Sequence, residues 1–337
     1  GTGTLAWPYS KFYFGESLLS LFLLLACWLV VQAQQRHPKS ALLVAGSALG
    51  TAIAVRAAAA IYFPAFLAYL LLEQRKKTGN RTAFIGPFLG QASLFTMGVF
   101  PAMCLFLWHN YRRFHAISHT GYAGQGFTTP LYVGLYGLLF SSGRSLFVYS
   151  PLLLLGVVSL AHFGQQFPAL RLFILTACAT VIPFYSMWWT WHGGWSWGPR
   201  FLVPLAPFLL LPLGAKLATR PWWRATGLVW LGSLLVVIPG VSVDFNPYII
   251  NSIQGDYANE SRLWFFPWAS PIIGHWHYLL TGQALTFGGT HLSDFGLPSV
   301  TNLIFLPIMG LIFLIALIHI VRIWQQPEVS SPILGHR

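Results

Sequence analysis

Residues 17–34, SLLSLFLLLACWLVVQAQ, form a long apolar run without a charged side chain. A helix needs about 20 predominantly apolar residues to cross the ~30 Å hydrocarbon core of a bilayer. This run therefore predicts a transmembrane helix. Similar runs recur at 41–55, 57–72, 84–108, 146–163, 170–187, 201–214, 225–243 and 300–320. Together they predict an all-α polytopic membrane protein with about nine transmembrane or membrane-embedded helices.

The composition of the whole chain agrees with this fold class. Of 337 residues, 55% are hydrophobic and 8% are charged, whereas soluble domains carry about 25% charged residues. This composition excludes a soluble enzyme, a coiled coil and a disordered tail. The net charge of +12 comes from basic residues spread between apolar runs, which indicates membrane topology rather than a nucleic-acid partner. The three cysteines have no paired spacing, so neither a disulfide framework nor a zinc site is predicted.

Arg56 divides the second and third runs, and the distribution of basic residues decides how they cross. One helix over 41–72 would be about 48 Å long, whereas a hairpin places 12 of the 19 basic residues inside. By the positive-inside rule we expect the N-terminus outside and the C-terminus inside. We further expect 1–337 to form a single transmembrane domain, with 244–299 an extracytoplasmic loop before the last helix. Because the chain opens at Gly1 without a signal pattern, we expect it to be the C-terminal portion of a larger protein.

Polar and aromatic residues gather in four places on the predicted outer side. The first group, Trp7–Glu16, ends in a carboxylate at a membrane boundary, where a charge is costly unless it is paired or used. An aromatic belt with Lys11 at the interface is the alternative. The second is Arg56, which either snorkels to the interface or offers its fork of donors to a lipid phosphate.

The third group lies in 109–151, where the glycines at 134, 137 and 143 let the backbone bend and approach a ligand closely. Arg144 stands at the entry to the next apolar run, and 130–140 is expected to form a re-entrant or interfacial helix. The fourth group is 188–200, WWTWHGGWSWGPR. Its tryptophans either anchor the chain at the interface or stack on sugar faces. His192 is either a general base or only a hydrogen-bonding residue.

The loop 244–299 contains His275-x-His277 and several carboxylates. The nearby acidic and histidine side chains are Asp256, Glu260, His291 and Asp294. Such a set is able to hold a divalent metal, but the spacing is generic, and a folded polar cap is the favoured alternative.

The order of these segments resembles the GT-C membrane glycosyltransferases. The segments are GTLAWPYSKFYFGE, GTAIAVRAAAAIYFPAFLAYLL, HNYRRF, GLYGLLFSSGRSLFVYSPLLLL and WHGGWSWGPRFLVPLAPFLLLPL. They are most similar to the bacterial relatives of the protein mannosyltransferases and to the aminoarabinose transferase of lipid A. The resemblance covers roughly 1–245, with Ser142 where the family usually has proline.

The resemblance implies an integral protein of the bacterial inner membrane, in the cell envelope. Such an enzyme transfers sugar from a polyprenyl-phosphate donor to a glycan, lipid or protein acceptor at the extracytoplasmic face. It implies an inverting displacement, with a divalent metal such as Mg²⁺ or Mn²⁺ near the donor phosphate. The family's main acidic residue lies upstream of the first matching segment, so the chain is expected to lack it.

The resemblance also assigns roles to residues of this chain, namely Glu16, Arg56, Arg144, Tyr149 and Arg200. The four groups on the predicted outer side supply the other candidates. Glu16 is the candidate catalytic acid that remains. The candidate phosphate-binding residues are Arg56, Arg144, Arg200 and Lys11. The candidate substrate-cavity residues are Tyr9, Tyr122, Tyr149, Trp191, His192 and Trp195.

Two other functions stay open at this point. One is a transporter or flippase for a lipid-linked or anionic substrate, and the other is a non-catalytic membrane subunit. Ionisable residues are nearly absent from the centres of the predicted spans. This favours chemistry at one face, because transporters usually carry polar groups at mid-membrane.

Overall fold

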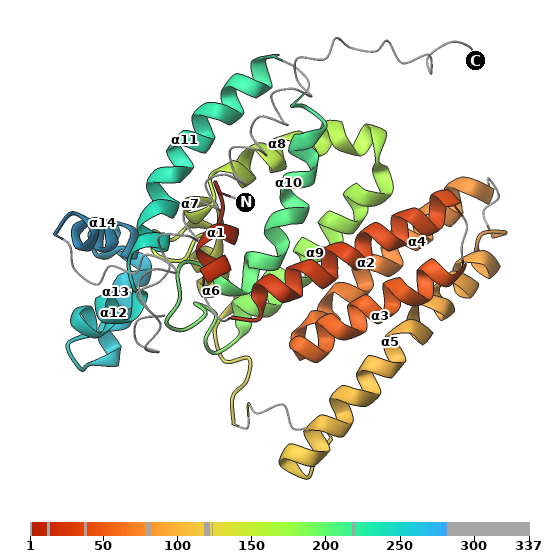
Figure 1. The fold of residues 1–337 in the computed structure, drawn as a ribbon, viewed down its shortest axis with the longest axis horizontal. Helices are drawn as coiled ribbons and strands as arrows, with labels where there is room; N and C mark the ends of the chain where they lie inside the picture. Colours follow the sequence, from red (N-terminus) through yellow and green to blue (C-terminus); the bar gives the residue numbers. More distant parts are fainter. Residues whose placement is uncertain are drawn as a thin grey trace, which may run out of the picture. The chain divides into compact units, whose positions relative to one another are not determined.

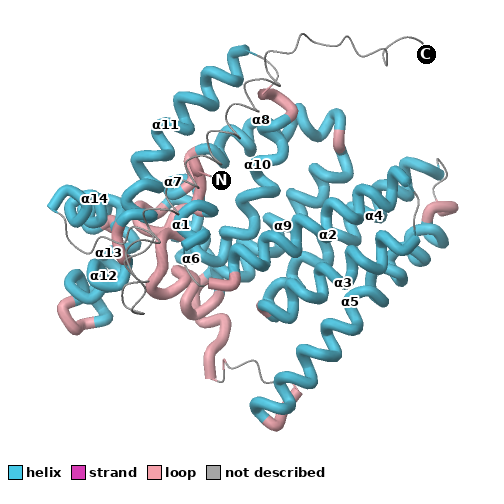
Figure 2. Tube along the Cα trace, viewed as in Figure 1, coloured by secondary structure: helices cyan, strands magenta, loops and turns pink. Residues whose placement is uncertain are grey.

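The computed structural model describes residues 2–11, 14–36, 39–78, 82–117, 122, 124–217 and 220–281, which lie in one compact unit, Gly1–Leu285. Within these residues the regular elements are all helices, with no strand (Figures 1 and 2). The all-α polytopic prediction is confirmed.

The predicted spans fall on helices wherever the structure describes them. The long apolar helices are α2 (Glu16–Arg36), η1–α4 (Ala57–Tyr62 and Phe63–Thr78), α5 (Ile85–Phe114), α9 (Pro168–Met187) and α11 (Arg220–Ser242). The shorter apolar helices are α3 (Lys39–Val55), α6 (Leu131–Phe140), α8 (Leu152–Gln166) and η2–α10 (Arg200–Leu205 and Ala206–Gly214). By length and composition, five helices of the described part are able to cross a membrane. The expected span 300–320 lies outside the described residues.

Helices α3 and α5 pack closely, because small residues let their backbones approach. A Cβ placed on Gly46 of α3 would lie 2.0 Å from the carbonyl oxygen of Phe95 in α5. A Cβ on Gly98 of α5 would likewise lie 2.1 Å from the carbonyl oxygen of Leu43. Close contact of this kind is how helices associate in a bilayer, where apolar surface alone supplies no driving force.

The chain reverses direction at Arg56, as the hairpin prediction requires. The backbone of Arg56 is extended (φ −152°, ψ 116°), which separates α3 from η1. Arg56 pairs with the first residue of α2, whereas Gln74 in α4 donates hydrogen bonds of 3.0 Å to Gln34, near the end of α2, and to Gln91 of α5. Helix α4 therefore runs back toward the end where α3 began. Which end faces outward stays a prediction.

The segment after α11 is folded and packs on the turn before α7 (Leu146–Tyr149). It contains α12 (Phe245–Ile253), η3 (Tyr257–Asn259), α13 (Glu260–Phe265), η4 (Pro267–Ala269) and α14 (Pro271–Thr281). The amide of Gly143 donates to the carbonyl of Trp264 at 2.9 Å, and the hydroxyl of Ser270 donates to the carbonyl of Ser142 at 2.9 Å. Within the described part of 244–299, a folded cap is thus what the structure contains.

Candidate functional site

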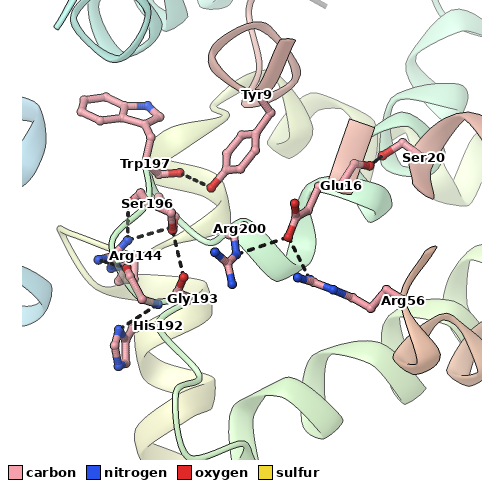
Figure 3. Close-up of polar contacts among 12 residues, drawn as sticks. Tyr9, Glu16, Ser20, Arg56, Arg144, His192, Gly193, Ser196, Trp197 and Arg200 are labelled. Atoms are coloured by element: carbon pink, nitrogen blue, oxygen red, sulfur yellow. Dashed lines mark hydrogen bonds and ion pairs between the residues drawn. The ribbon is translucent and has the colours of Figure 1, made fainter. Parts of the chain in front are cut away.

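Glu16, the first residue of α2, is the centre of an ion-pair cluster (Figure 3). Its side chain is 0% exposed, and its Oε1 lies 2.8 Å from Nη1 of Arg56 and 3.2 Å from Nε of Arg200. Arg56 links α3 to η1, and Arg200 begins η2, so three distant segments meet at one carboxylate. The pairing explains how a charge is tolerated here, because a buried carboxylate without a partner would be strongly destabilising. Two guanidiniums and one carboxylate leave a net charge of +1.

The ring of Phe201 fixes the two arginines beside each other. The Cζ atoms of Arg56 and Arg200 lie 5.1 and 5.0 Å from its centroid, and Arg200 also lies 4.7 Å from the ring centroid of Phe14. Cation–π contacts of this kind hold a guanidinium in place without using its N–H donors. The side chains of Arg56 and Arg200 remain 23% and 18% exposed, so donors are left for a ligand.

Both arginines line a cavity of about 410 Å³, which we call the arginine cavity. The rest of its lining is mainly aromatic. Its other described lining residues are Ala57, Ala58, Ala60, Ile61, Tyr122, Phe127, Phe184, Tyr185, Trp188, Thr190 and Phe201. None of these described residues is acidic. A concave apolar pocket with a few convergent polar groups is the usual form of a small-ligand site. The cavity suits a ligand with a negative head and an apolar or sugar-like body.

A second cavity of about 590 Å³ also has Arg56 in its lining and lies between the ends of α3 and α5. Tyr122 and Arg56 line both cavities. The second cavity also contains His109, Asn110 and Arg113. Arg56 and Tyr122 therefore stand where two ligands in adjacent cavities would meet.

Arg144 has a different environment from the other two arginines. It is fully buried, and its Nη atoms donate to the carbonyls of Ser196, Gly198 (3.1 Å) and Gly194 (2.9 Å). It lines neither cavity. The sequence analysis predicted Arg144 to be a phosphate-binding residue. In the structure its guanidinium instead donates to backbone carbonyls of the turn that leads into Arg200.

Lys11 also lies away from the arginine cavity. Its ammonium donates to the carbonyls of Val241 and Val243, next to the start of α12. Burial lowers the pKa of Lys11 from its usual value to about 8.

The predicted cavity tyrosines separate into two sets. Tyr122 lines both cavities. Tyr9 is buried and donates its hydroxyl to the carbonyl of Trp197 at 3.0 Å, and the Tyr149 ring packs edge-on against Trp197 with 5.1 Å between centroids. Tyr9 and Tyr149 thus pack against Trp197 in the 194–200 turn, and neither lines the arginine cavity.

The tryptophan-rich stretch is likewise divided between core and cavity. Trp191 is buried against Trp264, with ring centroids 5.5 Å apart, and Trp195 stacks on Tyr257. Trp188 lines the arginine cavity instead.

His192 is enclosed by neighbours from two segments. Its ring stacks on Trp264 with centroids 4.0 Å apart, and its Nδ1 accepts the amide of Gly194 at 3.2 Å. Its Nε2 lies 3.3 Å from Oγ1 of Thr190, and Glu260 Oε1 lies 3.7 Å from Nδ1. Burial, with smaller effects from two arginines, lowers the pKa of His192 to about 2, so the ring is neutral at physiological pH.

Several lining residues were not singled out by the sequence. Thr190, Trp188 and Phe201 lie within or beside the tryptophan-rich stretch, and Tyr185 lies one turn before it. Their position next to Arg200 was the only available signal, because sequence spacing does not tell which side chains of an irregular turn face a cavity.

The described residues do not fit the expected divalent metal beside the arginines. No three His, Cys, Asp or Glu side chains of the described part lie close enough to hold an ion. Glu16 is already held by two guanidiniums, and both would repel a cation placed there. The His291 and Asp294 of the proposed loop site lie outside the described residues.

Comparison with known protein families found one match. Residues 9–114 match the family model of dolichyl-phosphate-mannose-protein mannosyltransferase. Over this segment the chain is similar to glycosyltransferases of the GT-C kind. The matched segment contains Glu16 and Arg56 and ends before Arg200. No curated protein and no solved structure matches the chain. The match and the apolar helices support an integral membrane glycosyltransferase of the GT-C kind.

Proposed function

We propose that this protein binds a polyprenyl-phosphate-linked sugar through its phosphate and acts in transfer of the sugar to an acceptor at the extracytoplasmic face. The observation that carries the proposal is the convergence of Arg56 and Arg200 on one buried carboxylate, at the wall of an aromatic cavity. The match to the mannosyltransferase family model over residues 9–114 supports the same activity.

The net charge of the cluster suits both the donor and the leaving group. A sugar joined to a polyprenyl phosphate carries one negative charge, which the net +1 of Glu16, Arg56 and Arg200 offsets. In transfer, the bond between the sugar C1 and the phosphate oxygen breaks, and the electron pair leaves with the polyprenyl phosphate. The acceptor oxygen forms the new bond to C1 and loses its proton to a base. Fixed guanidiniums stabilise the charge that develops on the departing phosphate.

Glu16 acts in this proposal as a positioning residue. Its carboxylate is fully buried and is absent from the described lining of both cavities. A group without access to the ligand is poorly placed to take the acceptor proton. Its contribution is to hold two like charges side by side, which would otherwise repel each other.

Binding of polyprenyl phosphate, compared with uncharged polyprenol, tests the phosphate site. The two would be titrated into the purified chain in detergent and followed by tryptophan fluorescence. Replacing Arg56 or Arg200 with Gln should weaken polyprenyl-phosphate binding about 10- to 150-fold, because a charge-assisted hydrogen bond is worth about 1.5–3 kcal/mol. Polyprenol binding should not change.

The matched control is Arg112→Gln, since Arg112 is exposed on α5 and lines neither cavity. This variant should bind like the wild type. Wild-type affinity in both R56Q and R200Q would contradict the proposal. Passage of intact sugar donor across reconstituted vesicles, without cleavage, would favour transport over transfer.

A further inference from the structure

Thr190 lines the arginine cavity, and its hydroxyl has one described hydrogen-bonding neighbour. Oγ1 lies 3.3 Å from Nε2 of His192, and no other described residue bonds to this hydroxyl. A threonine hydroxyl has one proton to donate and two lone pairs to accept with. Which of the two atoms donates in the His192 contact therefore decides whether Thr190 offers the cavity a donor or an acceptor.

The tautomer of His192 decides which atom donates in its contact with Thr190. The Gly194 amide lies 3.2 Å from Nδ1, and a backbone N–H is always a donor, so Nδ1 must present its lone pair. A neutral imidazole carries one proton, which is then on Nε2. The turn that aims this amide needs φ +84° at Gly193 and φ +68° at Gly194, a conformation that glycine adopts without strain.

The competing tautomer would require Nδ1–H to bond to Glu260. Oε1 of Glu260 is 3.7 Å from Nδ1, which is beyond hydrogen-bond distance, and an Nδ1 proton would collide with the Gly194 amide. The charged groups that affect His192 are Glu260 from α13 and the two arginines Arg144 and Arg200. The arginines disfavour an imidazolium. Neutral His192 with the proton on Nε2 satisfies the fixed donor.

We infer that the Thr190 hydroxyl is a third donor of the arginine cavity, aimed at a phosphate oxygen of the ligand because its lone pair already accepts Nε2–H of His192. This inference rests on the proposed function for the identity of the ligand. The hydroxyl proton cannot point at His192, since Nε2 has no lone pair available in this tautomer. A phosphate in the cavity is then met by three donor residues: Arg56 from the hairpin tip, and Thr190 and Arg200 from the stretch 188–200.

Two substitutions of Thr190 test the donor. Thr190→Val keeps the branched shape and removes the hydroxyl, whereas Thr190→Ser keeps the hydroxyl. In the fluorescence titration, T190V should weaken polyprenyl-phosphate binding about 10-fold, as expected for one hydrogen bond to a charged acceptor, and leave polyprenol binding unchanged. T190S should bind within about 2-fold of the wild type. Equal phosphate affinity in T190V and wild type would overturn the inference.

A double-mutant cycle tests the link to His192. His192→Phe retains an aromatic ring against Trp264 but removes Nε2–H. Because His192 is inferred to act only through Thr190, the double variant T190V/H192F should bind no more weakly than T190V alone. Additive losses would contradict the link.

The tautomer itself is measurable without any ligand. In wild-type protein with ¹⁵N-labelled histidine, assigned by comparison with H192F, the His192 signals should show a protonated Nε2 and a bare Nδ1. A proton on Nδ1 would overturn the inference. The inference and the proposed function fail separately. If R56Q and R200Q lose phosphate binding while T190V does not, only the Thr190 donor is wrong. If neither arginine variant loses binding, the phosphate site itself is wrong.

Discussion

Replacement of Arg144 with Met separates a structural arginine from a ligand-binding one. Methionine retains an unbranched stem of similar reach but has no N–H groups. The substitution removes the donors that the fully buried Arg144 side chain now supplies to the carbonyls of Gly194, Ser196 and Gly198. The Gly198 carbonyl still accepts the amide of Arg200 at 3.0 Å, so the carbonyls of Gly194 and Ser196 are the two that lose their donor. Each unsatisfied buried carbonyl costs about 1–3 kcal/mol, so the two together cost at least about 2 kcal/mol.

The expected effect is a lower unfolding temperature. For domains of 150–250 residues, 1 kcal/mol shifts the midpoint by about 2–4 °C, so R144M should lose about 4 °C or more. Unfolding would be followed by tryptophan fluorescence in detergent. Arg112→Met serves as the control, because Arg112 is exposed, and its midpoint should stay within about 1 °C of the wild type.

The two possible roles of Arg144 give opposite results. If Arg144 braces the turn before Arg200, R144M is destabilised, and lowering the temperature restores much of its phosphate binding. If R144M unfolds like the wild type but binds polyprenyl phosphate more than 10-fold more weakly, Arg144 contacts the ligand. That result would refute the structural role.

Three further predictions concern Glu16, Lys11 and topology. Glu16→Gln should reduce sugar transfer by only about 10-fold, because it removes the charge between Arg56 and Arg200 while the Phe201 ring still contacts both guanidiniums; a loss of about 10²–10⁴ would instead indicate a general base. The pKa of Lys11 falls from 10.5 to about 8 on folding, so between these pH values the unfolded chain binds the proton and the folded chain does not. Wild-type stability relative to K11M should therefore rise from pH 8 to about 10.5, and a constant difference in unfolding midpoint would contradict this. In a background without native cysteines, a cysteine at position 257 should react with an impermeant reagent from outside and one at 76 only from inside; the reverse pattern would invert the proposed orientation.

The positions of the helices followed directly from the order of residues. Apolar runs such as 17–34 and 84–108 are long enough to span a bilayer, and backbone groups in hydrocarbon must be satisfied within the segment, which only helices and closed barrels achieve. The reversal at Arg56 was also predictable, because a single helix over 41–72 would be too long and the basic residues then fall on the wrong side. Both conclusions use local length and charge, which do not depend on how the helices pack.

The sequence also determined that Glu16, Arg56, Arg144 and Arg200 are charges at the ends of apolar runs, where each needs a partner. Only the tertiary structure decided which partner each one has. Arg200 and Arg56 meet at Glu16 beside a cavity, whereas Arg144 is enclosed by the carbonyls of a glycine-rich turn. An ion pair depends on distances of a few ångströms between segments far apart in the chain. Those distances are set by how α2, α3 and η2 pack, and spacing along one segment carries no information about them.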